Sequence, residues 1–169
     1  MFLITKLLRK DKMNRVNILA FLATISVLLG LTTNVNAAYG MQKVAYHVNY
    51  DDAKRQTGAL RNIQNHINAV GADKLDLRVI MHGKGLSMLL LPDEAENTKL
   101  KNGNANDKQQ STISHLKSQG VAFKVCANTL RGKKIQIDQL HDADESDIVP
   151  SGVAEVAHLQ GRGFSYLKP

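Results

Sequence analysis

The chain has 169 residues, 43% of them hydrophobic, with one cysteine, no tryptophan and a formal net charge of +7. Residues 1–37 contribute +4 of that charge and the remaining residues only +3, so the basic excess lies mainly at the amino-terminal end. The remainder has no basic stripe interleaved with aromatic residues, and its composition therefore does not indicate nucleic-acid binding. About 130 residues are enough for one domain with its own hydrophobic core.

Residues 1–37 have the order of a secretory signal peptide. Five Lys and Arg residues precede an uncharged, mostly apolar run from Ile18 to Leu31, and Val35 and Ala37 are small enough to form a cleavage site. A helix of this run would be about 21 Å long, shorter than a hydrocarbon core of roughly 30 Å, which favours cleavage over a retained membrane anchor. We predict a signal peptide at 1–37, cut after Ala37, a single domain at 38–169, and an exported, periplasmic protein with no membrane attachment after cleavage.

Strand-like and helical patterns alternate along the rest of the chain. Five short runs rich in β-branched and aromatic residues predict strands at 43–48, 75–81, 121–126, 148–149 and 164–167. Between the first two strands, Leu60, Ile63, Ile67 and Val70 recur at the spacing of a helix. Helices are also expected at 86–91 and 111–119 and from residue 151 onward, while 128–134 fits a turn or short helix and 135–140 a strand or a helical turn.

Two segments carry more specific expectations. Residues 92–110 are polar throughout, which predicts a solvent-exposed loop or a frayed helix start. In the last helix, the spacing predicts that Val153, Val156, Ala157 and Leu159 face inward.

Strands that alternate with helices and Gly-rich turns predict an α/β domain, with a mostly parallel sheet and helices on both faces. Right-handed crossovers bring the carboxyl ends of such strands to one edge, where ligands bind in sheets of this type. His47, His82 and Cys126 lie at or just after strand ends, as do residues 149–152. The sequence therefore predicts a functional site at this edge.

Cys126 is the residue that most needs an explanation, because a single cysteine cannot form an internal disulfide in an exported protein. A thiol between a strand and a helix N-terminus has a lowered pKa, and Arg131, Lys133 and Lys134 add positive charge nearby. In this interpretation Cys126 is a nucleophile. Free cysteines also commonly serve as small buried hydrophobic residues, and the pattern alone leaves both interpretations open.

The remaining candidate sites are weaker. No histidine spacing is typical of a zinc enzyme, and we predict no metal site. A hydrolase with Cys126, His82 and Asp51 or Asp52 is not singled out by any spacing. Ser151 and Gly152 fit a helix N-cap, and the acidic run 141–147 fits a solvated loop.

Several segments together resemble one known family. These are KVAYHVN at 43–49, ALRNI at 59–63, His82-Gly83, FKVCANTL at 123–130, and VPSGVAE at 149–155 with the ending YLKP. The chain resembles the DsrE/DsrF-like family of small sulfur-relay proteins, in its exported branch, over residues 42–169. The CANTL and VPSGV segments are the most specific parts of the resemblance. The Asn-rich segment 97–107 looks like an addition of this chain.

The resemblance implies a three-layer α/β/α domain of the flavodoxin-like type, with about five strands, that assembles as a homotrimer or homohexamer. It implies that Cys126 accepts sulfur as a persulfide, without a metal or cofactor. Residues expected to bind the persulfide or assist are Asn128, Thr129, Arg131, His47, His82 and Ser151. The partner would be a sulfur donor or acceptor protein or a small sulfur compound. The alternative is a non-catalytic oligomeric binding module with a structural cysteine, and an enzyme with its own turnover ranks below both.

Overall fold

We describe the fold from a computed structural model, which describes residues 39–169; the predicted signal peptide lies outside this range. Within the described residues no helix is long and apolar enough to span a membrane. The sheet has five parallel strands in the order β4-β3-β2-β1-β5. The strands are β1 (Gln42–Val48), β2 (Leu75–Met81), β3 (Ala122–Cys126), β4 (Ile148–Val149) and β5 (Ser165–Leu167).

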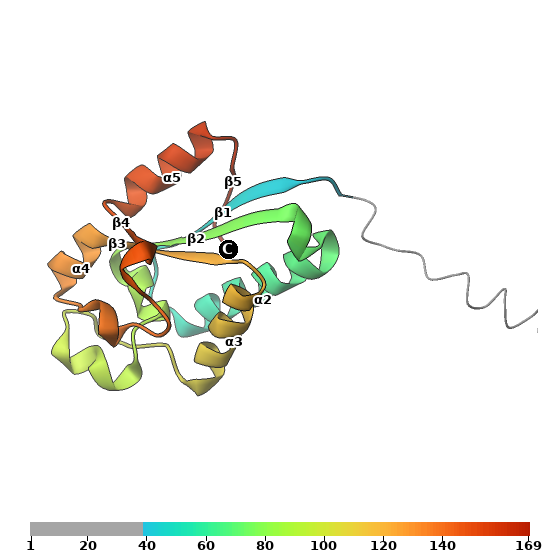
Figure 1. Cartoon of the computed structure of the whole chain (residues 1–169). Helices are drawn as coiled ribbons and strands as arrows, with labels where there is room; N and C mark the ends of the chain where they lie inside the picture. The colour runs from blue at the N-terminus through green and yellow to red at the C-terminus, as the bar shows by residue number, and fades with distance from the viewer. Residues whose placement is uncertain (1–38) are drawn as a thin grey trace, which may run out of the picture. The chain divides into compact units, whose positions relative to one another are not determined.

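The helices form a layer on each side of the sheet, as Figure 1 shows. On one side lie α2 (Ala53–Val70) and α3 (Asp107–Ser118), and on the other lies α5 (Gly152–Gly161). The short helix α4 (Ala127–Lys133) follows β3 directly. The 3₁₀ turns are η2 (Ala72–Lys74), η3 (Gly83–Met88), η4 (Pro92–Asn97), η5 (Ile137–Gln139) and η6 (Glu145–Asp147). The predicted three-layer α/β architecture with a five-stranded sheet is confirmed.

The two faces of the sheet differ because successive side chains of a strand point to opposite sides. One face carries the main core, in which Val44, Tyr46, Val79 and Phe123 pack with residues of α2 and α3. The opposite face has a small cluster formed by Ala45, Ile80, Leu159 and Phe164. Alternation places His47, His82 and Cys126 on this second face, which α5 covers only in part.

The polar segment 92–110 is more ordered than predicted. Leu100 and Ala105 are buried, and the Asn104 amide donates to Asp51 O at 2.9 Å and to Gln56 Oε1 at 2.8 Å. The Gln56 amide in turn donates to the buried Ser87 hydroxyl at 2.9 Å. Most of the segment is exposed or half-buried and a helix starts at Asp107, as predicted, but the prediction missed that part of the segment is anchored, because these amides find partners that a hydropathy pattern does not reveal.

The expectation for the last helix is also partly wrong. Leu159 is buried and Val156 packs against the small cluster, whereas Val153 is 65% exposed and Ala157 is exposed. The reason is that only one narrow stripe of α5 meets the sheet, where the apolar cluster beneath it is small. The other apolar residues of the helix therefore remain outside.

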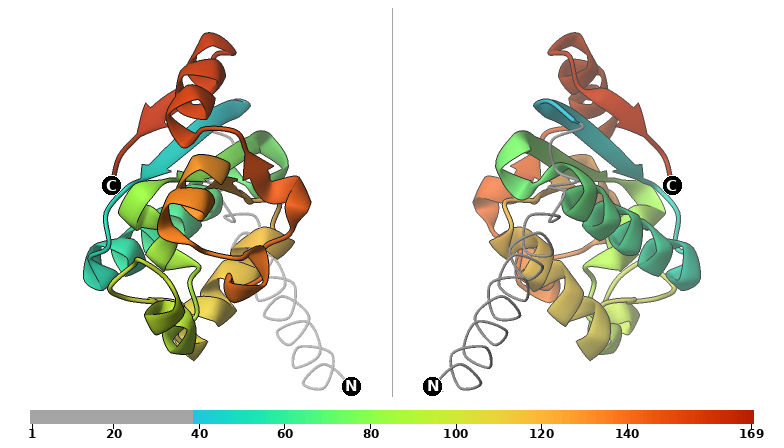
Figure 2. Two further views of the ribbon diagram at one scale, coloured as in Figure 1. Left: turned by 90° about the vertical axis from the view of Figure 1, so that its left-hand side faces the viewer. Right: turned by 90° about the vertical axis from the view of Figure 1, so that its right-hand side faces the viewer.

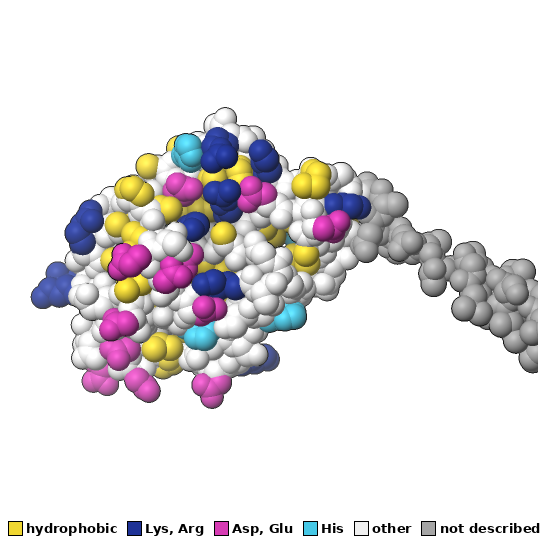
Figure 3. All heavy atoms as spheres, in the orientation of Figure 1, with side chains coloured by type: hydrophobic (Ala, Val, Ile, Leu, Met, Phe, Trp, Pro, Cys, Tyr) yellow, Lys and Arg dark blue, Asp and Glu magenta, His cyan; other side chains and the backbone are white. Residues whose placement is uncertain are grey.

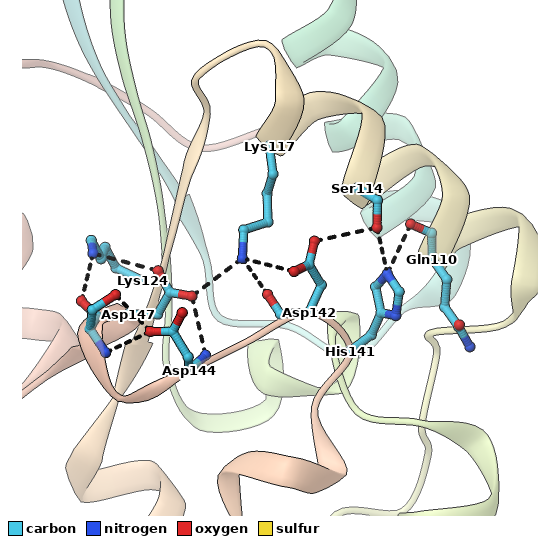
Figure 4. A network of polar contacts seen from close by, with 9 residues as sticks. Gln110, Ser114, Lys117, Lys124, His141, Asp142, Asp144 and Asp147 are labelled. Carbon is cyan, nitrogen blue, oxygen red and sulfur yellow. Dashed lines mark hydrogen bonds and ion pairs between the residues drawn. The ribbon is translucent and has the colours of Figure 1, made fainter.

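The acidic segment before β4 is fixed by ion pairs, which Figure 4 shows. Asp147 lies 3.4 Å from Lys117 Nζ and 3.6 Å from Lys124 Nζ, which come from α3 and β3. Lys117 also donates to the Asp142 carbonyl. The segment predicted as a solvated loop is thus held at both ends, and it sets the position of β4 and of the α5 N-terminus that follows.

Gly85 in η3 provides a direct test of packing beside the strand ends. A Cβ atom at this position would lie 2.0 Å from the carbonyl oxygen of Val48, the last residue of β1. We expect Gly85→Ala to lower the free energy of unfolding by about 2 kcal/mol or more, because the backbone must move. Urea denaturation measures this change.

Gly58→Ala is the matched control, since a Cβ at Gly58 in the middle of α2 meets nothing within 4 Å. This substitution should stabilise the protein by about 0.5–1 kcal/mol, because alanine favours the helix. Equal effects of the two substitutions would contradict the close packing of η3 against β1.

Candidate functional site

A row of four side chains crosses four neighbouring strands at one edge of the sheet. The strands lie in the order β5, β1, β2 and β3. Tyr166, His47 and Cys126 belong to β5, β1 and β3, and His82 directly follows β2. Met81 pairs with Val125, so the next residues, His82 and Cys126, come level on adjacent strands. The backbone at His82 is still extended, with φ −148° and ψ 167°. Neighbouring strands lie about 4.8 Å apart, so the His82 and Cys126 side chains are neighbours on one face.

Cys126 ends β3 and is the residue before the first turn of α4. Its side chain is buried, with a relative exposure of 3%. Val149 pairs with Cys126 across β3 and β4, and three residues later Gly152 begins α5. The starts of two helices therefore meet at this sulfur atom.

Burial and hydrogen bonding act in opposite directions on the Cys126 thiol. Burial raises its pKa, because a charged sulfur loses solvation. The Thr129 hydroxyl and the backbone N–H groups of Gly152, Thr129 and Asn128 favour a charged sulfur, and together they bring the pKa of Cys126 below the usual value. The site thus favours a thiolate in a place that water barely reaches.

Thr129 and Gly152 connect the sulfur to its surroundings. The Thr129 hydroxyl accepts a hydrogen bond from the Gly83 N–H at 2.8 Å, which fixes the hydroxyl beside Cys126. Gly152 packs against His82, since a Cβ added there would lie 2.8 Å from His82 Cβ. Any side chain at position 152 would therefore displace the His82 imidazole, the backbone N–H of residue 152 beside Cys126, or both.

The two histidines form a directly bonded pair. His47 Nε2 lies 2.7 Å from His82 Nε2, and His47 Nδ1 lies 2.8 Å from the Tyr166 hydroxyl. Burial, the neighbouring His82 and Lys168 lower the pKa of His47 to about 4. Burial and Lys168 also lower the pKa of His82. His47 is therefore neutral near pH 7, and both rings resist gaining a second proton.

The last residues pass beside the ends of β1 and β2. Figure 2 shows the C-terminus beside the carboxyl end of β1. The Tyr50 hydroxyl and Arg55 Nη2 donate to the Pro169 carbonyl at 2.9 and 3.1 Å. These bonds hold the segment after β5, and with it Lys168, near the histidines.

The other residues proposed from the sequence contribute in different ways. The backbone N–H of Asn128 helps to lower the pKa of Cys126, while its side chain accepts from Arg131 Nη2 at 2.5 Å. Arg131 is exposed, and its guanidinium contacts Asn128. The Ser151 hydroxyl caps α5 by accepting from the Ala154 N–H at 3.4 Å. Ser151 therefore positions Gly152, its neighbour.

Sequence reasoning missed Tyr166 and Lys168 as parts of this site, and it placed Gly152 at this edge of the sheet without assigning it an effect on the sulfur. The signal for Tyr166 was available only once the strand order was known, because β5 follows β4 in sequence but lies beside β1. The role of Gly152 depends on its contact with His82, which no local pattern encodes.

Other clusters in the described residues offer less chemistry. No group of three or more His, Cys, Asp or Glu residues there is arranged to hold a metal ion. Ser114 lies 2.9 Å from His141 Nε2, but the nearby Asp142 carboxylate contacts Ser114 and not the imidazole, so a triad is not formed (Figure 4). Figure 3 shows acidic and basic side chains mixed on one face, with hydrophobic ones between them.

Comparison with known proteins places the chain in a family. Residues 35–169 match the DsrE/DsrF-like family. The chain belongs to that family. Among solved structures it is similar to a protein of unknown function, MTH1491, from Methanobacterium thermoautotrophicum, with 25% sequence identity and a TM-score of 0.60. The likeness covers 76% of this chain and 99% of MTH1491. A comparison with curated proteins found no similar sequence.

The Thr129 hydroxyl provides a test of how this DsrE/DsrF-like protein lowers the pKa of Cys126. Thr129→Val removes the donor and keeps the shape of the side chain. We expect the pKa of Cys126 to rise by about one pH unit, so that alkylation by iodoacetamide at pH 7 slows about tenfold.

Thr129→Ser keeps the hydroxyl and serves as the control, with alkylation expected near the wild-type rate. Unchanged alkylation in Thr129→Val would show that the backbone donors alone set the pKa of the thiol.

Proposed function

We propose that this protein is an exported sulfur carrier of the sulfurtransferase type, in which Cys126 accepts a sulfur atom as a persulfide. The observation that carries the proposal is the place of the buried Cys126 sulfur at the starts of α4 and α5, beside a set of polar groups from Thr129, Asn128 and Gly152 that lower its pKa. A purely structural cysteine needs no such set. Membership of a family that generally comprises sulfur-relay proteins supports the same function.

The chemistry requires only the thiolate and a sulfur donor. The Cys126 thiolate attacks the outer sulfur of a donor persulfide, RS–SH, a new S–S bond forms at Cys126, and the donor leaves as RS⁻. With thiosulfate, the same attack transfers the sulfane sulfur and releases sulfite. Electrons and atoms balance in both cases, and no metal or cofactor takes part. Delivery to an acceptor thiolate is the reverse step.

The site also offers reasons why a persulfide would persist once formed. Donor N–H groups stabilise negative charge on sulfur, and burial of Cys126 restricts attack by water or oxidants. The donor and acceptor remain an unidentified protein or a small sulfur compound. The homotrimer or homohexamer implied by the resemblance stays a prediction.

Intact-mass spectrometry tests sulfur acceptance. After incubation of the reduced protein with polysulfide or thiosulfate, we expect a gain of one sulfur atom that a thiol reductant reverses. Because the chain has a single cysteine, Cys126→Ala should abolish the gain. The Thr129→Ser variant should still be loaded.

The alternative function, a non-catalytic binding module with a structural cysteine, predicts a different outcome. The protein would gain no sulfur, and Cys126 would react with alkylating agents only after denaturation. This result would overturn the proposal, since a carrier must expose its sulfur to a donor in the folded state.

Export is the second part of the proposal and rests on the sequence of residues 1–37. When the full chain is expressed in a Gram-negative bacterium, we expect the periplasmic fraction to contain a protein that begins at Ala38. N-terminal sequencing measures the cleavage site. Replacement of Ala37 by a bulky residue should leave the precursor uncut, while a full-length protein in the cytoplasm would contradict export.

A further inference from the structure

We infer that His47, His82 and Tyr166 form a proton-sharing row beside Cys126, in which His82 Nδ1 exchanges a proton with the sulfur and Tyr166 orients the row. This inference rests on the proposed function and extends it, because it assigns the groups that handle the proton of the Cys126 thiol. It is carried by the two short contacts along the row and by the shared face of the four residues.

The pairing of the two rings leaves one nitrogen of His82 without a ring partner. His82 Nε2 is engaged by His47, so Nδ1 is the only ring nitrogen of His82 left for another partner. Among the described residues, no hydrogen bond to His82 Nδ1 is present, and no buried polar side-chain atom lacks a partner. His82 Nδ1 is therefore accessible, on the face that it shares with the neighbouring Cys126.

Neutral rings allow two arrangements of the row. In the first, His82 Nε2–H donates to His47 Nε2, His47 Nδ1–H donates to the Tyr166 oxygen, and His82 Nδ1 is a free acceptor. In the second, the Tyr166 hydroxyl donates to His47 Nδ1, His47 Nε2–H donates to His82 Nε2, and His82 Nδ1–H is a donor. The contact between the two Nε2 atoms permits no other neutral pairing, because one must donate and the other accept.

Conversion between these arrangements carries one proton away from the sulfur. The Cys126 S–H proton moves to His82 Nδ1, the His82 Nε2 proton moves to His47 Nε2, and the His47 Nδ1 proton moves to the Tyr166 oxygen. Tyr166, which is 38% exposed, releases its own proton to water. One proton leaves, both imidazoles stay neutral, and the thiolate gains a donor at His82 Nδ1.

The charges around the row suit this neutral exchange. Lys168 acts on both imidazoles and disfavours a second proton on either. On the η3 side, Lys84 is paired with Asp51 at 3.3 Å. On the α5 side, Gly152 contacts His82 and carries no charge. A cationic imidazole is therefore disfavoured, and the row works by exchange of tautomers.

The test compares three variants of the row with one control. The variants are His82→Gln, His47→Gln and Tyr166→Phe, and the control is Tyr46→Phe. Tyr46 donates or accepts with its hydroxyl at 3.1 Å from His66 Nδ1, so it is a second Tyr–His contact, on the opposite face of the sheet. Tyr46→Phe therefore makes the same chemical change as Tyr166→Phe, loss of a tyrosine hydroxyl that contacts a histidine, at a position outside the row.

The first readout is the ultraviolet absorbance of the thiolate as a function of pH, with the Cys126→Ser protein subtracted. We expect the ratio of thiolate to thiol at a given pH to fall about tenfold in His82→Gln and about threefold in Tyr166→Phe. Tyr46→Phe should match the wild type. An unchanged titration in His82→Gln, or an equal change in the control, would overturn the inference.

The second readout is the tautomer of His82 from imidazole nitrogen NMR. We expect a proton on Nδ1 when Cys126 is a thiolate and on Nε2 when it is a thiol. The same tautomer in both states would also overturn the row. Neither readout needs sulfur transfer, so a wild-type protein that accepts no sulfur would defeat the proposed function while these measurements still decide the inference.

Discussion

A sulfur atom that is buried and yet has a lowered pKa is the constraint around which the site is built. Burial alone would raise the pKa of Cys126 and leave an inert thiol. The opposing effect requires donors from two chain segments that are distant in sequence, namely the start of α4 and the start of α5. The parallel pairing of β3 with β4 brings these segments together, since Cys126 and Val149 are in register. The fold therefore serves the chemistry by bringing together two helix starts.

Much of this arrangement follows from alternation in the sequence. Strand residues two apart share a face, so His47 accompanies Ala45, His82 accompanies Ile80, and Cys126 accompanies Lys124. Once the strand order is known, the same rule adds Tyr166. The edge of the sheet and three members of the row were accessible from the sequence for this reason. The fourth depended on the placement of β5 beside β1, a tertiary contact between segments about 120 residues apart.

The parts that sequence patterns missed share a physical cause. In segment 92–110, polar side chains are held by buried partners, as Asn104 is by Gln56 and Ser87, and composition does not distinguish an amide in water from one in a network. In α5, apolar residues such as Val153 remain exposed because the sheet beneath offers only a narrow apolar surface. Pattern-based reasoning assumes that apolar residues find a core and polar ones find solvent. Both assumptions fail where the side chains of a neighbouring helix, strand or loop decide whether a residue is buried or exposed.

The neutrality of the two histidines has a consequence for sulfur transfer. A cationic imidazole beside Cys126 would stabilise a thiolate strongly, but it would also hold a persulfide anion and oppose its transfer to an acceptor. Stabilisation by N–H dipoles is weaker and is similar for thiolate and persulfide, both of which are singly charged. Burial, supported by Lys168, disfavours protonation of both rings and so keeps a cationic imidazole away from the sulfur. A carrier must bind its cargo and release it, and a site that stabilises both forms of the sulfur about equally meets that requirement.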